Sequence, residues 1–103
     1  MLLKGGKNMP KPIDYYQNVI IQSVQKISDM DYEEWKWREQ YIDFQGTVSI
    51  WESTEKFKGK HFISFNDLMG NHMHTGCGEY TVSDNIITMT TRNSIYTFKI
   101  IHK

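Results

Sequence analysis

Alternating apolar and polar side chains in the second half of the chain constrain its fold more than any other feature. Between residues 41 and 51, apolar side chains recur at every second position: Ile42, Phe44, Val48 and Ile50, with Gly46 in phase. A period of two is typical of a strand that buries one face. The pattern therefore predicts a strand over 41–51, and comparable runs predict four more strands over 61–66, 72–82, 86–91 and 95–101.

Connections with turn-forming residues separate these five predicted strands, and one of them is the predicted turn over 67–71. Because consecutive strands joined by short loops usually pair with each other, we expect an antiparallel meander. Gly76 and Gly78 lie inside the third predicted strand and indicate a bulge or a sharp bend there. The expected core side chains are Ile63 and Phe65 in the second strand and Tyr96, Phe98 and Ile100 in the fifth.

The first third of the chain follows a different period. After Pro12, apolar residues recur at steps of three or four: Ile13, Tyr16, Ile20, Val24 and Ile27, with Val19 widening the stripe. Because such steps bring side chains onto one face of a helix, the spacing predicts an amphipathic helix over 12–28. A helix of this kind is not stable alone in water, so we expect it to pack on the sheet.

A second, short helix is predicted over 31–38. Its start carries carboxylates, which cap a helix and interact favourably with its dipole: Asp29 or Asp31 as the cap, and Glu33 and Glu34 in the first turn. Trp35 and Trp37 alternate as they would in a strand, which leaves a strand open as the alternative.

These elements together predict an α+β fold, with a single domain over 12–103. The N-terminal amphipathic helix and the short second helix would pack on a five-stranded antiparallel β-meander, either open or curved into a half-barrel. A cystatin-like or nuclear-transport-factor-like arrangement of helix and sheet fits this expectation. The stretch 78–82 followed by 86–89 is similar to the late hairpins of lipocalin-like barrels, and this resemblance implies a small-ligand-binding domain.

Composition narrows the functional classes. The 12 basic and 12 acidic residues balance, so no overall field steers the chain onto nucleic acid or an anionic membrane. The single cysteine, Cys77, excludes an intramolecular disulfide, and no apolar run approaches the ~20 residues of a membrane-spanning helix. We therefore expect a cytoplasmic protein that does not associate with membranes.

The N-terminal residues 1–11 are expected to form a flexible tail. Residues 1–8 are either part of that tail or a translated leader before a native start at Met9. The absence of alanine and the abundance of residues with AT-rich codons indicate a low-GC bacterium, or its phage or mobile element, as the source.

The segment 71–79 holds the densest cluster of metal-ligating residue types. His72 and His74 would point to the same side of a strand, and a bulge at Gly76 would bring Cys77 round to join them. Zinc or copper would suit such ligands, with Glu79 or His61 adding a further one. The alternative is that the two imidazoles lie on a solvated face while Cys77 acts as a small apolar residue.

The sequence contains no paired-carboxylate motif, phosphate-binding loop or nucleophile elbow, and no helix follows Cys77 to activate its thiol. We therefore expect no catalytic residues, no enzyme activity and no required cofactor. One basic segment, with Lys56, Lys58 and Lys60, could contact nucleic acid through the 56–61 loop. The alternative, a solvated turn, fits the balanced charge better.

Trp35 and Trp37 directly follow a run of acidic residues, and Trp51 lies on the polar face of its predicted strand. Aromatic residues beside charged ones are typical of protein interfaces, and the alternative is that these tryptophans pack on the second helix or the tail. The predicted partner-binding residues are Trp35, Trp37, Tyr41, Trp51, Asp31, Glu33 and Glu34. The leading hypothesis is a small non-enzymatic binding or inhibitor protein that acts through a protein–protein interface, such as a host-defence antagonist or immunity protein encoded by a phage or mobile element. Its partner is another protein or a second copy of the chain. The alternatives are a lipocalin-like or cystatin-like ligand-binding domain and a metal-binding protein.

Overall fold

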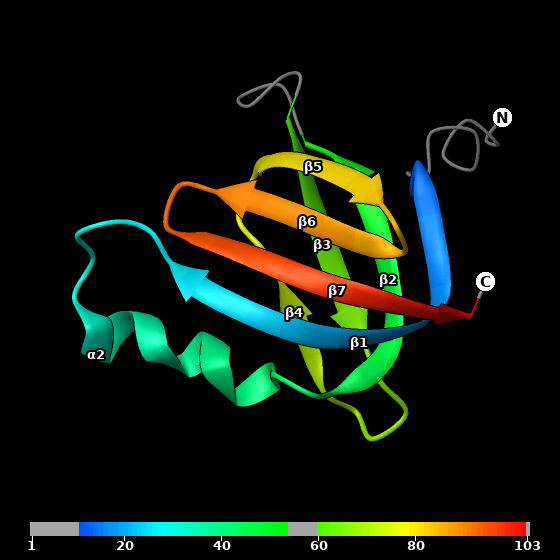
Figure 1. Cartoon of the computed structure of the whole chain (residues 1–103), viewed down its shortest axis with the longest axis horizontal. Coiled ribbons are helices and arrows are strands. Elements are labelled where there is room, and N and C mark those ends of the chain that lie inside the picture. The colour runs from blue at the N-terminus through cyan, green and yellow to red at the C-terminus, as the bar shows by residue number, and fades with distance from the viewer. Residues whose placement is uncertain (1–10, 54–59, 103) are drawn as a thin grey trace, which may run out of the picture.

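Strand β1, Asp14–Lys26, is the longest element of the fold and occupies the region where the sequence predicts a helix. The computed structural model describes residues 11–53 and 60–102 (Figure 1). The first half of β1 pairs with β2, Gln45–Glu52, and its second half pairs with β7, Ser94–His102. One strand thus connects the two ends of the remaining sheet.

Two short helical pieces and four more strands complete the described chain. The helical pieces are α2, Tyr32–Trp35, and the 3₁₀ helix η1, Lys36–Tyr41, which follows it directly. The strands are β3, His61–Asn66, β4, His72–His74, β5, Gly78–Ser83, and β6, Ile86–Thr91.

The sheet closes on itself. Its strand order is β2-β1-β7-β6-β5-β3-β4, and β3 also pairs with β2, so six antiparallel strands form a closed barrel. Strand β4 lies outside this ring and pairs with β3 alone. Strands β3 and β5 have the shortest pairing in the ring, since His61 pairs with Gly78 alone. The predicted α+β fold, with a helix on an open or half-closed meander, is therefore wrong: the structure is mostly β.

Bulges in β1 explain why its sequence resembles that of a helix. The pairing register shifts between Tyr16 and Val19 against β2, and between Ile21 and Ser23 against β7. Each bulge inserts an extra residue, so a step of two between inward-facing positions becomes a step of three. The inward-facing residues are accordingly the partly buried Tyr16 and the buried Val19, Ile21 and Val24. The steps of three at the bulges place Tyr16, Val19 and Val24 in the predicted helical stripe, whereas Ile21, which that stripe leaves out, is completely buried.

The two ends of the predicted helical stripe show that the helix is absent. Ile13 is 48% exposed and Ile27 is 43% exposed, although a helix packed on the sheet would have buried both. The β-branched residues of 19–24 also favour an extended backbone, because branching at Cβ restricts their rotamers in a helix.

Most of the remaining pattern is confirmed. The predicted strands over 61–66 and 86–91 have the observed bounds, and the expected core residues of 61–66 and 95–101 are buried. The strand predicted over 72–82 is divided into β4 and β5 by a break at 75–77, where the glycines indicated a bend. Asp84 and Asn85 both have positive φ between β5 and β6, as a tight type I′ hairpin turn requires.

The barrel interior is filled by side chains. Val48, Ile50, Ile63, Phe65, Ile87, Met89 and Phe98 are completely buried there, together with the inward residues of β1. The predicted short helix is present as α2 and η1, which lie along one side of the barrel near β1 (Figure 1). Trp35 extends the core into this helical segment.

Gly78 should be intolerant of a side chain, because an added Cβ would lie 1.9 Å from the carbonyl oxygen of Thr90. We expect Gly78→Ala to lower the free energy of unfolding by about 1–3 kcal/mol, as overpacking generally does. Urea denaturation measures this change.

Gly76→Ala is the matched control, since its added Cβ would meet nothing closer than 3.8 Å. Equal stability of the two variants would contradict the close approach of β5 to β6 at Gly78.

Candidate functional site

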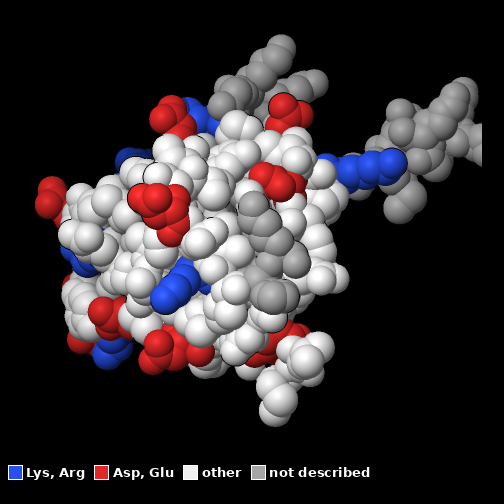
Figure 2. Space-filling view, turned by 45° about the vertical axis from the view of Figure 1, so that its right-hand side comes forward, with Lys and Arg blue, Asp and Glu red and all other residues white. Residues whose placement is uncertain are grey.

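Charged side chains are scattered over the surface among uncharged ones, without a large area of one sign on the face that Figure 2 shows. Of the predicted basic patch, Lys60 forms an ion pair with Glu79, with 3.2 Å between Nζ and Oε2. Lys56 and Lys58 lie outside the described residues. The hypothesis of a nucleic-acid contact through the 56–61 loop stays a prediction.

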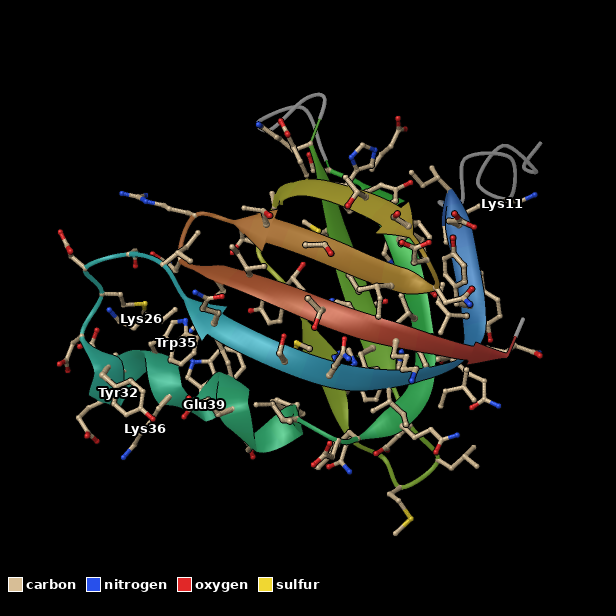
Figure 3. All side chains as sticks on the ribbon, viewed as in Figure 1. Lys11, Lys26, Tyr32, Trp35, Lys36 and Glu39 are labelled. Atoms are coloured by element: carbon tan, nitrogen blue, oxygen red, sulfur yellow. The ribbon has the colours of Figure 1, made fainter. Side chains whose placement is uncertain are left out.

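Trp35, one of the predicted partner contacts, is buried at the end of the barrel where β1 ends and β7 begins. Its side chain is 1% exposed, and its Nε1 donates a hydrogen bond of 2.8 Å to Oγ of Ser94, which is itself buried. Figure 3 shows Trp35 pointing from the helical segment toward the strands, whereas Tyr32 and Lys36 point away. The Trp35 indole therefore contributes to the core and is not accessible to a partner in this structure.

Trp37 and the predicted acidic residues lie together on the helical segment. Trp37 is 43% exposed, the Arg38 guanidinium lies 4.6 Å from the centre of its ring, and Tyr41 packs against its edge. Asp31 precedes the first helical residue, and Glu33 forms an ion pair with Lys36 on the surface. Tyr41 is half-buried and packs against the core.

Trp51 lies elsewhere, near the far end of β2. Six residues separate it from the start of β2, a distance of roughly 20 Å along an extended chain. Because its neighbour Ile50 faces the interior, Trp51 faces outward, where its ring stacks on Phe62 of β3. Its Nε1 donates to Oγ of Ser64 at 3.0 Å. The predicted partner contacts are therefore divided between two places.

The two histidines of β4 extend the aromatic group around Trp51. The buried Met73 lies between them, so both imidazoles face outward, and their ring centres are 4.4 Å apart. His74 packs against Phe62, and Nδ1 of His72 lies 3.1 Å from Oδ1 of Asn66. We call this surface the outer aromatic row: Trp51, Phe62, His74 and His72.

The structure does not assemble the complete predicted metal site. His72 and His74 lie together, but Cys77 lines a different pocket, which also includes Arg38 and Arg92. His61 packs on Tyr80, and Glu79 pairs with Lys60. Within residues 11–53 and 60–102, no group of three or more His, Cys, Asp or Glu side chains is placed to hold a metal ion.

The turn between β3 and β4 presents two apolar side chains that the sequence analysis assigned only to a turn. Leu68 is fully exposed and Met69 is 84% exposed. The carboxylate of Asp67 accepts hydrogen bonds from the backbone N–H groups of Met69 and Asn71, at 2.9 and 2.8 Å, and a third from the Asn71 side chain. These bonds lower the pKa of Asp67. We call Leu68 and Met69 the apolar tip.

An open groove of about 890 Å³ lies beside the apolar tip, between the start of β1, the start of β2 and the β3–β4 turn. Tyr15 and Phe44 give it aromatic walls, and Leu68 and Met69 form part of its border. Its polar lining is mostly of amides, from Gln17, Asn18, Gln45, Asn66 and Asn71. Among the residues that the structure describes, Asp67 is the one carboxylate in its lining, and no lysine or arginine takes part.

Comparison of the chain with protein-family models, with curated proteins and with solved structures finds no match. None of the helices in the described part of the chain has the length and apolar character to cross a membrane.

The His72–His74 pair should show a measurable pH effect. Burial, and then the charge of His72, lower the pKa of His74. We therefore expect His72→Ala to raise the pKa of His74 toward its usual value, as followed by NMR titration of the ring protons. His61→Ala is the control, and an unchanged His74 pKa in His72→Ala would contradict the electrostatic coupling.

The sign of the stability effect follows from the same shift. The pKa of His74 is lower in the folded chain than in the unfolded chain. The stability that the neutral His74 side chain contributes is therefore fully present at a pH above its pKa in the unfolded chain, and it is lost as the pH falls through its pKa in the folded chain.

Proposed function

We propose that this chain is a non-enzymatic binding protein that docks a protein partner through the apolar tip and the adjoining outer aromatic row. The observation that carries the proposal is the exposure of Leu68 and Met69 on a turn held by three hydrogen bonds to Asp67. Exposing two large apolar side chains side by side costs solubility and contributes nothing to the core. A surface that contacts an apolar partner explains their position.

The rigidity of the turn supports a docking role. A loop that is already ordered loses little conformational entropy when it binds, so more of the contact energy appears as affinity. A backbone hydrogen bond closes the base of the turn, because the N–H of Asp67 donates to the carbonyl oxygen of Asn71 at 3.1 Å. These hydrogen bonds hold the backbone of the turn that carries the apolar tip.

The groove indicates the chemistry of the partner. Its one carboxylate keeps its negative charge, but its oxygens already accept three hydrogen bonds within the turn, which leaves them less available to donors of a partner. Its aromatic walls favour apolar side chains, and its amides offer hydrogen bonds to a peptide backbone. We therefore propose that the partner inserts an uncharged segment rich in apolar residues.

The outer aromatic row continues this surface. Asn66 lines the groove and also contacts His72, so the row and the groove share a boundary. Trp51 is one of the partner-binding residues predicted from the sequence, and its outward position in this row supports a role as an anchor. A host-defence antagonist or immunity protein of a phage or mobile element would use such a surface, and that identity stays a prediction.

The alternative of a small ligand between helix and sheet has less support. The space between the helical segment and the barrel is occupied by Trp35, and completely buried side chains fill the barrel interior. The groove is open and lies outside the barrel.

The double substitution Leu68→Ser and Met69→Ser tests the proposal. Partners are captured from the source cell with the unmodified protein, purified and titrated by calorimetry. We expect the double variant to bind at least about tenfold more weakly, as expected for the loss of interface anchors. Since both side chains are exposed, unfolding in urea should change by less than about 0.5 kcal/mol.

Val82→Ser is the matched control, because Val82 is an exposed apolar residue on β5 that does not line the groove. Equal affinity of the double variant and the unmodified protein would contradict a role of the apolar tip. If the unmodified protein instead sediments as a dimer and the double variant as a monomer, the occupant is a second copy of the chain.

A further inference from the structure

The chain contains two arginines, and both line the same pocket although they are far apart in the sequence. Arg38 belongs to η1, and Arg92 lies in the turn between β6 and β7. The pocket has a volume of about 410 Å³, and its wall also includes Cys77 and Asn93. We call it the arginine pocket. It shares no residue with the groove beside the apolar tip.

The Arg38 guanidinium is held in place but is not fully hydrogen-bonded. Its Nη1 donates to the carbonyl oxygen of Trp35 at 3.0 Å, and its plane lies near the Trp37 ring. Its Nε is buried without a hydrogen-bond partner among the described residues. An arginine normally binds a carboxylate or phosphate through two parallel N–H groups. Arg38 has such a pair in Nε and Nη2, but Nε is buried, so the side chain must rotate before a ligand can contact both.

The charges in the pocket are not balanced from within. The ion pairs of the described chain join Lys36 to Glu33 and Lys60 to Glu79, and neither arginine takes part in one. Within residues 11–53 and 60–102, no aspartate or glutamate lines the pocket. Two arginines that line a concave site without a counter-charge favour an anion there, and the planar donors of a guanidinium suit oxyanions in particular.

We infer that the arginine pocket binds an oxyanion, either a carboxylate or a phosphate group. Arg38 supplies the paired N–H edge after a small rotation of its side chain, which also satisfies its buried Nε. Arg92 adds a second positive charge from the turn, and the Asn93 amide adds a neutral donor. The volume exceeds that of a bare phosphate, so the oxyanion is carried by a small organic group. This inference does not depend on the proposed docking surface.

The single cysteine provides a specific readout, because Cys77 lines the pocket and no other thiol exists in the chain. The experiment measures the rate of Cys77 alkylation by iodoacetamide, an uncharged reagent, at constant ionic strength. We expect inorganic phosphate or succinate to slow alkylation in a saturable way, with half of the effect on the order of 1 mM. Both steric shielding and neutralisation of the nearby arginines would slow the reaction.

Substitutions locate the effect. Arg92→Gln and Arg38→Lys should each raise the anion concentration that gives half of the protection by about tenfold. Arg92→Gln removes a charge-assisted contact, and Arg38→Lys keeps the charge but removes the paired N–H geometry. Lys99→Gln removes an exposed positive charge from β7 and is the control with unchanged protection. Since Arg92 is exposed on a turn, its substitution remains informative if Arg38→Lys does not fold.

The arms of the titration distinguish the sources of the oxyanion. Protection by phosphate alone identifies a phosphate ligand, and protection by succinate alone identifies a carboxylate ligand. Equal slowing by chloride at the same ionic strength would show simple charge screening and would overturn the inference. Protection that survives in Arg92→Gln would overturn it as well.

Discussion

Two bulges in β1 are the feature on which the rest of the structure depends. They allow one strand to give its first half to β2 and its second half to β7, with Val19 paired to both neighbours. Bulges increase local twist and bend a strand, which a small barrel requires in order to close. Without this shared strand, β2 and β7 would each expose an unpaired edge.

Closure of the barrel determines which surfaces remain for binding. Six strands are used in the ring, so the β3–β4 hairpin alone among the described strand pairs projects a strand beyond it. This hairpin carries the apolar tip and three members of the outer aromatic row, Phe62, His72 and His74. On the other side, Trp35 anchors the helical segment to Ser94 and thereby fixes Arg38 beside the β6–β7 turn. The fold thus separates an apolar docking surface from a cationic pocket.

Local alternation located most of the strands after residue 41, because it reflects one buried face. The strand predicted over 41–51 nevertheless begins only at Gln45, and the one predicted over 72–82 is divided into β4 and β5. The same reasoning failed for 12–28, since bulges change the spacing of inward residues from two toward three. The sequence could not show that Trp35 is buried and that Trp51 faces outward, because the exposure of each side chain depends on which elements pack over it. The arginine pocket depends on contacts between distant segments, so no local pattern could indicate it. The apolar tip did leave a signal, namely two large apolar residues within a predicted turn.

The central claim, that residues 14–26 form a bulged strand shared by both edges of the sheet, is tested most directly by nuclear Overhauser contacts of Val19 in the NMR spectrum. The account predicts cross-strand contacts from Val19 to Gly46 on one side and to Ile100 on the other. Contacts between residues three and four positions apart along 14–26, without those cross-strand contacts, would show a helix and contradict it.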